Sequence, residues 1–452
     1  MNILETSELL RSRRVSPVEL TKECLARIEK LNPALNAFIN VTGESALAEA
    51  RRAEEEIQRG DWRGPLHGIP IALKDLIDVA GVPTTAASNL FRNRIATEDA
   101  GIVRQLKNAG AVFLGKQNLH EFAYGGSSMI SAYGPVRNPW NLEHIAGGSS
   151  GGSAASVAAG LCYAAIGTDT AGSIREPAAL CGVVGLKPSF DLVSVRGIFP
   201  LSKSYDHAGP LTRTVADAAI VLQAIVDGNK EPNEFISALN APLPQNLRLG
   251  VIRSFFFEDI DLEVSAATEE ALKVLSSVGQ LRDIALEQVP VDRTLQAAES
   301  YDTHAELVSK NPELYQPETL RRITNGANAE PGEIARRRQE LEQQRREIAG
   351  VFENADFLIT PSVPIPASLV SKLREEPERL RPAEILLLRN TRPFNVWGVP
   401  AISVPCGFTK SGLPVGLQIA GPYGAEAAVL QLAHIYEQRT GWHRLQPSKS
   451  RE

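Results

Sequence analysis

Short apolar runs of strand length alternate with helical stretches along most of the chain. The strand candidates are 67–79, 109–118, 356–362, 400–407 and 414–421. The helix candidates are 16–31, 43–59, 264–276, 333–354 and 424–439. The stretch "SAASVAAGLCYAAIGTD" predicts a helix followed by a strand. Continuous apolar runs are typical of strands buried on both faces, so the alternation predicts an α/β protein with a largely buried sheet.

The chain shows no obvious boundary between domains. Its 452 residues would suit about three domains by length alone. However, no stretch has the composition of a linker, and no internal repeat is present. We therefore expect a single domain over residues 1–452, with a more irregular helical insert at about 285–390.

Composition and charge argue against several classes of protein. A formal net charge of -6 without a basic stripe argues against direct binding of nucleic acid. The N-terminus lacks the features of a signal peptide, and no apolar run is long enough to span a membrane. The four cysteines are scattered and the histidines show no ligand spacing. We therefore expect a cytoplasmic protein with no metal and no cofactor.

Two patches of glycine and serine flank one apolar segment in the middle of the chain. They are "GGSSGGSAAS" at 147–156 and "GTDTAGSIR" at 167–175. Glycines permit backbone conformations that other residues avoid, so such patches are not only flexible linkers. Backbone N–H groups that converge on one point can form an oxyanion hole. The joint occurrence of the two patches therefore indicates a catalytic site.

The first patch also matches G-x-S-x-G, the nucleophile elbow of α/β-hydrolases, with Ser149 at its centre. That elbow follows a strand, whereas the stretch "RNPWNLEHIA" before this patch contains a proline and several turn residues. The histidines downstream stand in no suggestive context: His207, His304, His434 and His443. These two observations disfavour a nucleophile elbow.

A serine can be activated without histidine when a neutral lysine accepts its proton. Burial favours the neutral amine because it disfavours the ammonium ion. Lys74 stands at the end of the run "IPIAL", where a buried strand would carry it into the interior. Lys74 is therefore the candidate general base.

The segment "GGSSGGSAASVAAG…GTDTAGSIREPAALCGVVGLKP" resembles the signature of the amidase signature family. Similar motifs extend over almost the whole chain: "GPLHGIPIALKDLIDVAGVPTT", "NLHEFAYGGSSMISAYGPVRNPWN", "SYDHAGPLTRTVADAA" and "PFNVWGVPAISVPCGF". The weakest match lies at 225–390. The resemblance implies a large mixed β-sheet covered by α-helices on both faces, with a catalytic core at about 60–220 and 390–440.

The family pattern implies a Ser-cisSer-Lys triad that hydrolyses a carboxylic amide. Lys74 matches the general base, Ser149 the bridging serine after a cis peptide bond, and Ser173 the nucleophile that carries the acyl group. The resemblance also implies an oxyanion hole made by the N–H groups of Ser173 and its predecessors Thr170, Ala171 and Gly172.

Residues around the triad receive supporting roles. We expect Asp169 and Arg175, which flank the nucleophile, to hold its loop rather than to contact substrate. Tyr124, Met129 and Trp397 are candidate walls of the substrate pocket, and a place in the core is the alternative for each.

The family includes general amidases and the A subunit of glutamyl-tRNA(Gln) amidotransferase. In the latter, an aspartate precedes a T-x-P-x-N stretch, and alignment on "TRPFN" (391–395) places Leu388 there. This favours an amidase that acts on a small-molecule amide. An amidotransferase component with partner subunits is the alternative, and the intact triad disfavours a non-catalytic assembly role. The sequence leaves the existence of a homodimer open.

Overall fold

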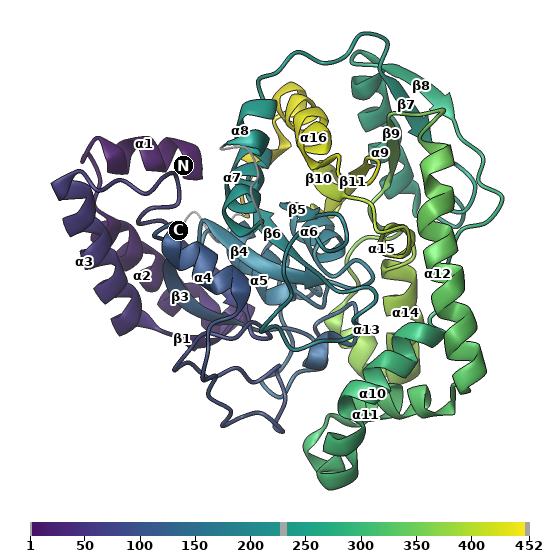
Figure 1. Ribbon diagram of the computed structural model, residues 1–452, viewed down its shortest axis with the longest axis horizontal. Coiled ribbons are helices and arrows are strands. Elements are labelled where there is room, and N and C mark those ends of the chain that lie inside the picture. Colours follow the sequence, from purple (N-terminus) through teal and green to yellow (C-terminus); the bar gives the residue numbers. More distant parts are fainter. Residues whose placement is uncertain (1, 227–232, 448–452) are drawn as a thin grey trace.

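A mixed β-sheet runs through the centre of the protein (Figure 1). The structure, a computed structural model, describes residues 2–226 and 233–447. Within these ranges eleven strands follow the order β1-β3-β2-β4-β6-β5-β10-β11-β9-β7-β8. The strands are β1 (Phe38–Val41), β2 (Pro70–Lys74), β3 (Val112–Gln117), β4 (Ala164–Asp169), β5 (Val184–Lys187), β6 (His207–Thr212), β7 (Arg248–Val251), β8 (Gln280–Asp283), β9 (Phe357–Pro361), β10 (Ala401–Phe408) and β11 (Pro414–Ala420).

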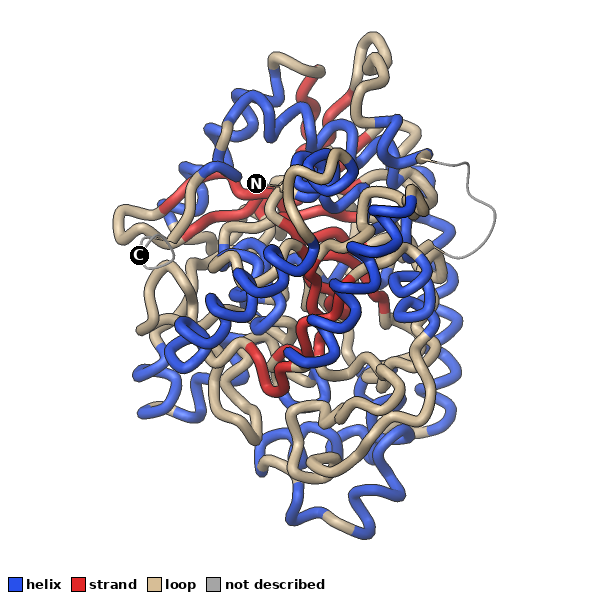
Figure 2. Tube along the Cα trace, turned by 90° about the vertical axis from the view of Figure 1, so that its left-hand side faces the viewer, coloured by secondary structure: helices blue, strands red, loops and turns tan. Residues whose placement is uncertain are grey.

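Helices cover both faces of this sheet, and Figure 2 shows the strands crossing the interior between them. The helices are α1 (Ile3–Arg11), α2 (Pro17–Leu35), α3 (Gly43–Arg59), α4 (Gly101–Asn108), α5 (Gly151–Ala158), α6 (Arg175–Cys181), α7 (Val215–Ile225), α8 (Glu234–Ala238), α9 (Leu262–Ser276), α10 (Thr294–Lys310), α11 (Pro317–Thr324), α12 (Pro331–Val351), α13 (Val370–Glu375), α14 (Leu380–Leu387), α15 (Arg392–Val396) and α16 (Glu426–Thr440). This arrangement confirms the expected fold class.

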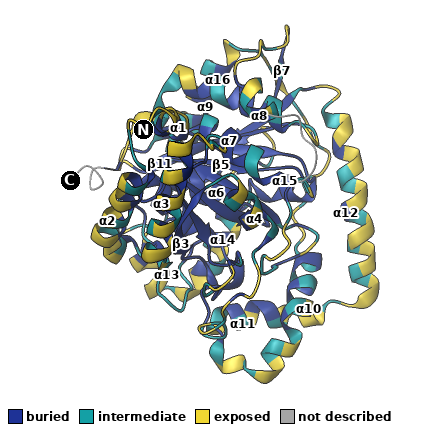
Figure 3. Cartoon of the chain, turned by 60° about the vertical axis from the view of Figure 1, so that its left-hand side comes forward, coloured by how far each residue is buried: buried dark blue, intermediate teal, exposed yellow. Residues whose placement is uncertain are grey.

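Two apolar clusters hold the layers together. On one face, α1, α4, α7, α9 and α16 pack against side chains such as Ile71 and Ile166. On the other face, α2, α3, α5 and α6 pack against side chains such as Ala72 and Ala165. Neighbouring residues of one strand therefore serve opposite faces, as the alternation of side chains along a strand requires. Figure 3 shows the buried sheet and the exposed outer sides of α2, α3 and α12.

The topology brings two strand ends to one edge of the sheet. β2 pairs in parallel with β4, with Leu73 opposite Ile166. Lys74 is the last residue of β2, and Asp169 is the last residue of β4. Because parallel strands end at the same edge, the segments that follow them lie side by side, and this edge holds the candidate site.

The predicted insert at 285–390 does not lie wholly outside the sheet. It carries α10 to α14, as its helical character predicts, but it also contains β9. β9 pairs with β11 on one side and with β7 on the other. The apolar run at 356–362 is thus a central strand. No helix in the described ranges is both long and apolar enough to cross a membrane.

Candidate active site

Lys74 is fully buried and bonded to three hydroxyl groups. Its Nζ lies 2.7 Å from Oγ of Ser149, 2.9 Å from Oγ of Ser150 and 2.7 Å from Oγ1 of Thr168. An ammonium group can donate to all three, whereas a neutral amine has only two N–H groups and one lone pair. One hydroxyl must then turn and donate to Lys74.

Burial lowers the pKa of Lys74 to about 7, although the carboxylates of Asp169 and Asp206 raise it. A substantial fraction of the amine is therefore neutral at neutral pH and able to accept a proton. Asp206 is half-buried, and its loss of hydration raises its pKa to about 6. Its Oδ1 accepts a 2.6 Å hydrogen bond from the Thr170 hydroxyl.

The two serines next to Lys74 are not equivalent. The peptide bond between Gly148 and Ser149 is cis, in agreement with the resemblance. Oγ of Ser150 donates to the carbonyl oxygen of Thr168 at 3.2 Å, so its proton is already committed. For the hydroxyl proton of Ser149 the structure shows no such acceptor among the described residues. Ser149 is therefore the serine that can pass a proton to Lys74.

Ser173 lies in the turn between β4 and α6 and is 4% exposed. The N–H of Ser150 donates to the carbonyl oxygen of Ser173 at 3.3 Å and so joins the two glycine–serine patches. The carboxylate of Asp169 accepts from the N–H groups of Gly172 at 2.8 Å and Ile174 at 3.2 Å. This carboxylate fixes the backbone on both sides of Ser173.

The guanidinium of Arg175 anchors the same loop from behind. Nε and Nη2 each lie 3.0 Å from a carboxylate oxygen of Asp169, and both side chains are fully buried. Burial alone would raise the pKa of Asp169, but the ion pair with Arg175 holds it below its usual range. Arg175 also donates to Asn395 and to Gln418, which tie it to α15 and β11. Asp169 and Arg175 therefore hold the loop.

The prediction for Gly172 needs a correction. Its N–H donates to Asp169, so it is not available to an oxyanion, and the donors that remain are Thr170, Ala171 and Ser173. The structure nevertheless requires a glycine at this position. Its φ is +132°, and an added Cβ would lie 1.9 Å from Oγ1 of Thr391.

A cavity of about 220 Å³ adjoins the site. Thr168 and Thr170 line it on the side of Lys74, together with Asp206. Apolar side chains such as Phe199 and Leu201 form most of the remaining wall. An apolar cavity with few polar groups is typical of small-molecule sites.

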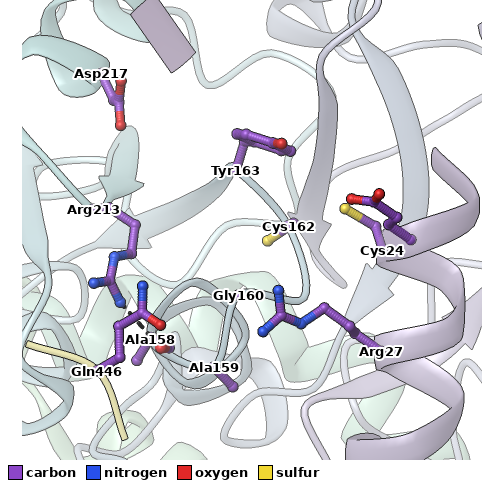
Figure 4. A pocket seen from close by; sticks show the side chains of 11 residues that line it. Cys24, Arg27, Ala158, Ala159, Gly160, Cys162, Tyr163, Arg213, Asp217 and Gln446 are labelled. Atoms are coloured by element: carbon purple, nitrogen blue, oxygen red, sulfur yellow. Dashed lines mark hydrogen bonds between the residues drawn. The ribbon is translucent and has the colours of Figure 1, made fainter. Parts of the chain in front are cut away.

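A second pocket, of about 170 Å³, lies between α2 and the end of α5 (Figure 4). Its two thiols, Cys24 and Cys162, are free and buried, and burial raises the pKa of each. The guanidinium of Arg213 donates to the carbonyl oxygens of Ala158 and His443. These bonds secure the chain near its C-terminal end, and the triad residues do not line this pocket.

The three candidate wall residues differ in their surroundings. Trp397 is buried and packs edge-on against Phe394 in an apolar cluster. Met129 is only half-buried and packs against the outside of another such cluster. Tyr124 is buried as well, but the guanidinium of Arg381 lies 6.0 Å from its ring centroid. The described residues contain no group of His, Cys, Asp and Glu that could hold a metal ion.

Comparison with known proteins identifies the class to which this fold and site belong. A family model described as Amidase matches residues 19–430. The A subunit of glutamyl-tRNA(Gln) amidotransferase from Carboxydothermus hydrogenoformans is 37% identical over 480 residues, which cover 98% of each chain. A solved structure of 6-aminohexanoate cyclic dimer hydrolase with its substrate is 30% identical, with a TM-score of 0.89, over 99% of this chain and 98% of that one.

A further solved structure, of a vestigial protein complex related to the origins of an s-triazine catabolic enzyme, is 32% identical with a TM-score of 0.89. It covers 98% of this chain and 99% of that chain. Together these likenesses define an amide-hydrolysing enzyme. The chain belongs to the amidase family.

Proposed function

We propose that the protein hydrolyses a small carboxylic amide through an acyl-enzyme on Ser173. Neutral Lys74 takes the proton of Ser149, and Ser149 takes the proton of Ser173. Oγ of Ser173 bonds to the carbonyl carbon, and the electron pair of the C=O bond moves to the oxygen. The observation that carries this proposal is the buried Lys74, with its pKa of about 7, bonded to Ser149, whose hydroxyl proton has no acceptor among the described residues.

The second half of the reaction returns each proton. Ser149 gives its proton to the leaving nitrogen and regains one from Lys74, and the C–N bond breaks to release ammonia or an amine. Water then attacks the acyl carbon and passes one proton to Lys74 through Ser149. The bond between the acyl carbon and Oγ of Ser173 breaks, Oγ regains this proton from Lys74 through Ser149, and the carboxylic acid is released. The N–H groups of Thr170, Ala171 and Ser173 stabilise the oxyanion, and each such donor is worth about a hundred- to thousandfold in rate.

We further propose that the enzyme works without a partner subunit. A Cβ added at Gly172 would lie 3.1 Å from Cδ2 of Leu388, so Leu388 lies against the loop that carries Ser173. An apolar side chain there offers nothing to a substrate ammonium group. We place the enzyme in the cytoplasm, because its four free thiols favour a reducing compartment.

A glutaminase component of an amidotransferase is the second candidate, favoured by the similarity to the A subunit from Carboxydothermus hydrogenoformans. Release of ammonia by the purified chain distinguishes the independent amidase from the glutaminase component. With no partner added, we expect turnover of simple amides that exceeds turnover of glutamine. Turnover of glutamine alone, appearing only with partner subunits, would establish the second candidate instead.

A further inference from the structure

Glu176 is a buried acid that the proposed mechanism does not use. It lies in the first turn of α6, three residues after Ser173, and its side chain is fully buried. Its Oε1 has no hydrogen-bond partner within the described ranges. Burying a carboxyl group is costly unless hydrogen bonds compensate for the lost water, so the contacts that Glu176 does make indicate its role.

Glu176 contacts both glycine–serine patches. Oε2 of its carboxyl group accepts a hydrogen bond from the N–H of Gly148 at 2.7 Å. Its own backbone N–H donates to the carbonyl oxygen of Gly172 at 2.7 Å. Gly148 directly precedes Ser149 in the chain, and the second glycine directly precedes Ser173. One residue therefore bonds to the neighbours of both serines.

The carboxyl group fits closely against the backbone before Ser149. A Cβ added at Gly147 would lie 2.7 Å from Oε2 and 2.8 Å from Oε1 of Glu176. A Cβ added at Gly148 would lie 2.7 Å from the backbone nitrogen of Ser128. This part of the backbone is therefore in close contact with both neighbours and has little room to move.

The backbone around Ser149 has few other fixed points. Its carbonyl oxygen accepts from the N–H of His120 at 3.1 Å and from the hydroxyl of Ser128 at 3.2 Å. Of Ser149 and the two glycines before it, only Gly148 has an N–H with a hydrogen-bond acceptor in the described ranges. The bond to the carboxyl group therefore holds the N-terminal side of Ser149.

The surroundings of Glu176 favour the neutral form of its carboxyl group. Burial raises its pKa well above the usual range for a glutamate, and the carboxylates of Glu384 and Asp169 raise it further, although the bond from Gly148 lowers it. In the neutral form Oε2 accepts the N–H and the proton lies on Oε1. A glutamine side chain has a similar shape and the same accepting oxygen, so it can replace Glu176 in this contact.

We propose that Glu176 is a positioning residue for Ser149. Its carboxyl oxygen holds the N–H of Gly148 and thereby keeps Oγ of Ser149 at hydrogen-bond distance from Lys74. The inference rests on the proposed amidase function and adds the residue that keeps its proton path aligned. A misplacement of about 1 Å in such a path can cost about a hundredfold in rate.

Two substitutions of Glu176 distinguish the hydrogen bond from the volume of the side chain. Glu176→Met keeps a side chain of similar length but removes the acceptor, so kcat for amide hydrolysis should fall about 30- to 300-fold. KM should change less than about threefold, because the contacts with substrate remain. Glu176→Gln keeps the acceptor, and its kcat should stay within about threefold of wild type. A Glu176→Gln variant as slow as Glu176→Met would overturn the proposal.

Glu437→Met is the matched control. Glu437 lies on α16, on the opposite face of the sheet, and is 5% exposed. Its Oε1 accepts the N–H of Val215 at 2.9 Å, and its Oε2 has no hydrogen-bond partner in the described ranges. The control should lower the midpoint of chemical denaturation as Glu176→Met does, but leave kcat within about twofold of wild type. An equal loss of kcat in the control would assign the effect to general destabilisation and overturn the proposal.

A double-mutant cycle tests whether Glu176 acts through Ser149. In a Ser149→Ala background the positioned hydroxyl is absent, so Glu176→Met should lower kcat by less than about threefold further. Should Glu176→Met not fold, Glu176→Asp serves the same cycle, because its carboxyl group is one carbon further from Gly148, and it should lose at least about fivefold in kcat. A full additional loss in the Ser149→Ala background would show that Glu176 acts through the loop of Ser173 and would overturn the proposal.

Crystal structures of the Glu176 variants test the contact independently of catalysis. Oγ of Ser149 should lie more than about 3.5 Å from Nζ of Lys74 in Glu176→Met and stay in hydrogen-bond contact in Glu176→Gln. An unmoved Ser149 in Glu176→Met would overturn the proposal, whatever the rates. A displaced Ser149, in a protein whose wild type hydrolyses no amide, would refute the amidase function alone and support the contact.

Discussion

Nζ of Lys74 lies 2.7 Å from Oγ of Ser149, although 75 residues separate them in the chain. The contact arises because β2 ends at Lys74, beside β4, and α5 begins two residues after Ser149. Burial at this edge keeps the amine partly neutral. In the proposed mechanism, Lys74 is the base, and its hydrogen bond with Ser149 is the path by which a proton reaches it.

The two serines bonded to Lys74 should respond differently to removal of the hydroxyl. Ser149→Ala should lower kcat/KM by about 10²- to 10⁴-fold, because the proton path to Lys74 is lost. Ser150→Ala should cost less than about tenfold, because the Ser150 proton is bound to the carbonyl oxygen of Thr168. Initial rates of amide hydrolysis measure both. Equal losses would show that Ser150 carries protons too.

Activity should depend on pH through the protonation of Lys74. Below its pKa of about 7 the amine is an ammonium ion and cannot accept a proton. kcat/KM should therefore fall about tenfold for each pH unit below 7 and level off above it. The measurement is a profile of kcat/KM from about pH 5 to pH 9. A profile that falls above neutral pH would contradict this assignment of the base.

The carboxylate of Asp206 raises the pKa of Lys74. In Asp206→Asn that negative charge is absent, so the ammonium form loses stabilisation and the pKa of Lys74 should fall further. The acid limb of the profile should then move to lower pH, whereas Asp191→Asn, at an exposed position, should leave it in place. A shift to higher pH in Asp206→Asn would mean that Asp206 does not act through Lys74.

The backbone at Gly172 should tolerate no side chain. In Gly172→Ala the new Cβ would collide with Thr391, and the φ of +132° is unfavourable for alanine. We expect a loss of at least about a hundredfold in kcat, since the loop that holds the oxyanion must move. Gly332→Ala is the control, because an added Cβ there meets nothing within 4 Å. Wild-type kcat in Gly172→Ala would contradict the described loop.

The ion pair behind the nucleophile should matter for stability. Asp169→Asn leaves the buried Arg175 without its charged partner, which typically costs about 3–5 kcal/mol in the free energy of unfolding. Asp61→Asn removes an exposed pair with Arg59, with side chains 62% and 66% exposed, and should cost less than about 1 kcal/mol. Chemical denaturation compares the two variants. Equal losses in the free energy of unfolding would show that the buried ion pair stabilises the protein no more than the exposed pair does.

The sequence predicts the interior of this fold better than its edges. Continuous apolar runs mark β2, β9, β10 and β11 because both faces of these strands are buried. β1 and β8 lie at the two ends of the sheet and have only four residues each. β8 is mostly exposed and polar, and β1 is only partly buried, so the sequence pattern did not predict either strand. The sequence of β9 does indicate a buried strand. However, the pattern of apolar residues does not show that β9 pairs with β11 on one side and with β7 on the other.

The candidate site, like the fold, could be predicted only in part from the sequence. Lys74, Ser149 and Ser173 could be assigned from their motifs. Thr168, Ser150 and Asp206 lie in the same motifs, but only the contacts in space show what each of them bonds to. Nη2 of Arg175 meets Asn395 across 220 residues of sequence, and no local pattern encodes that distance. The direction of the Gly172 N–H likewise depends on backbone angles, which explains the correction to the oxyanion donors.

Labelling with a fluorophosphonate probe tests whether Ser173 is the nucleophile and Lys74 is its base. Intact-mass spectrometry and peptide mapping are applied to the wild type and to Lys74→Ala. We expect a single adduct on Ser173 that forms about 10²- to 10⁴-fold more slowly in Lys74→Ala, because the base is missing. An adduct on Ser149, or a labelling rate that does not depend on Lys74, would contradict it.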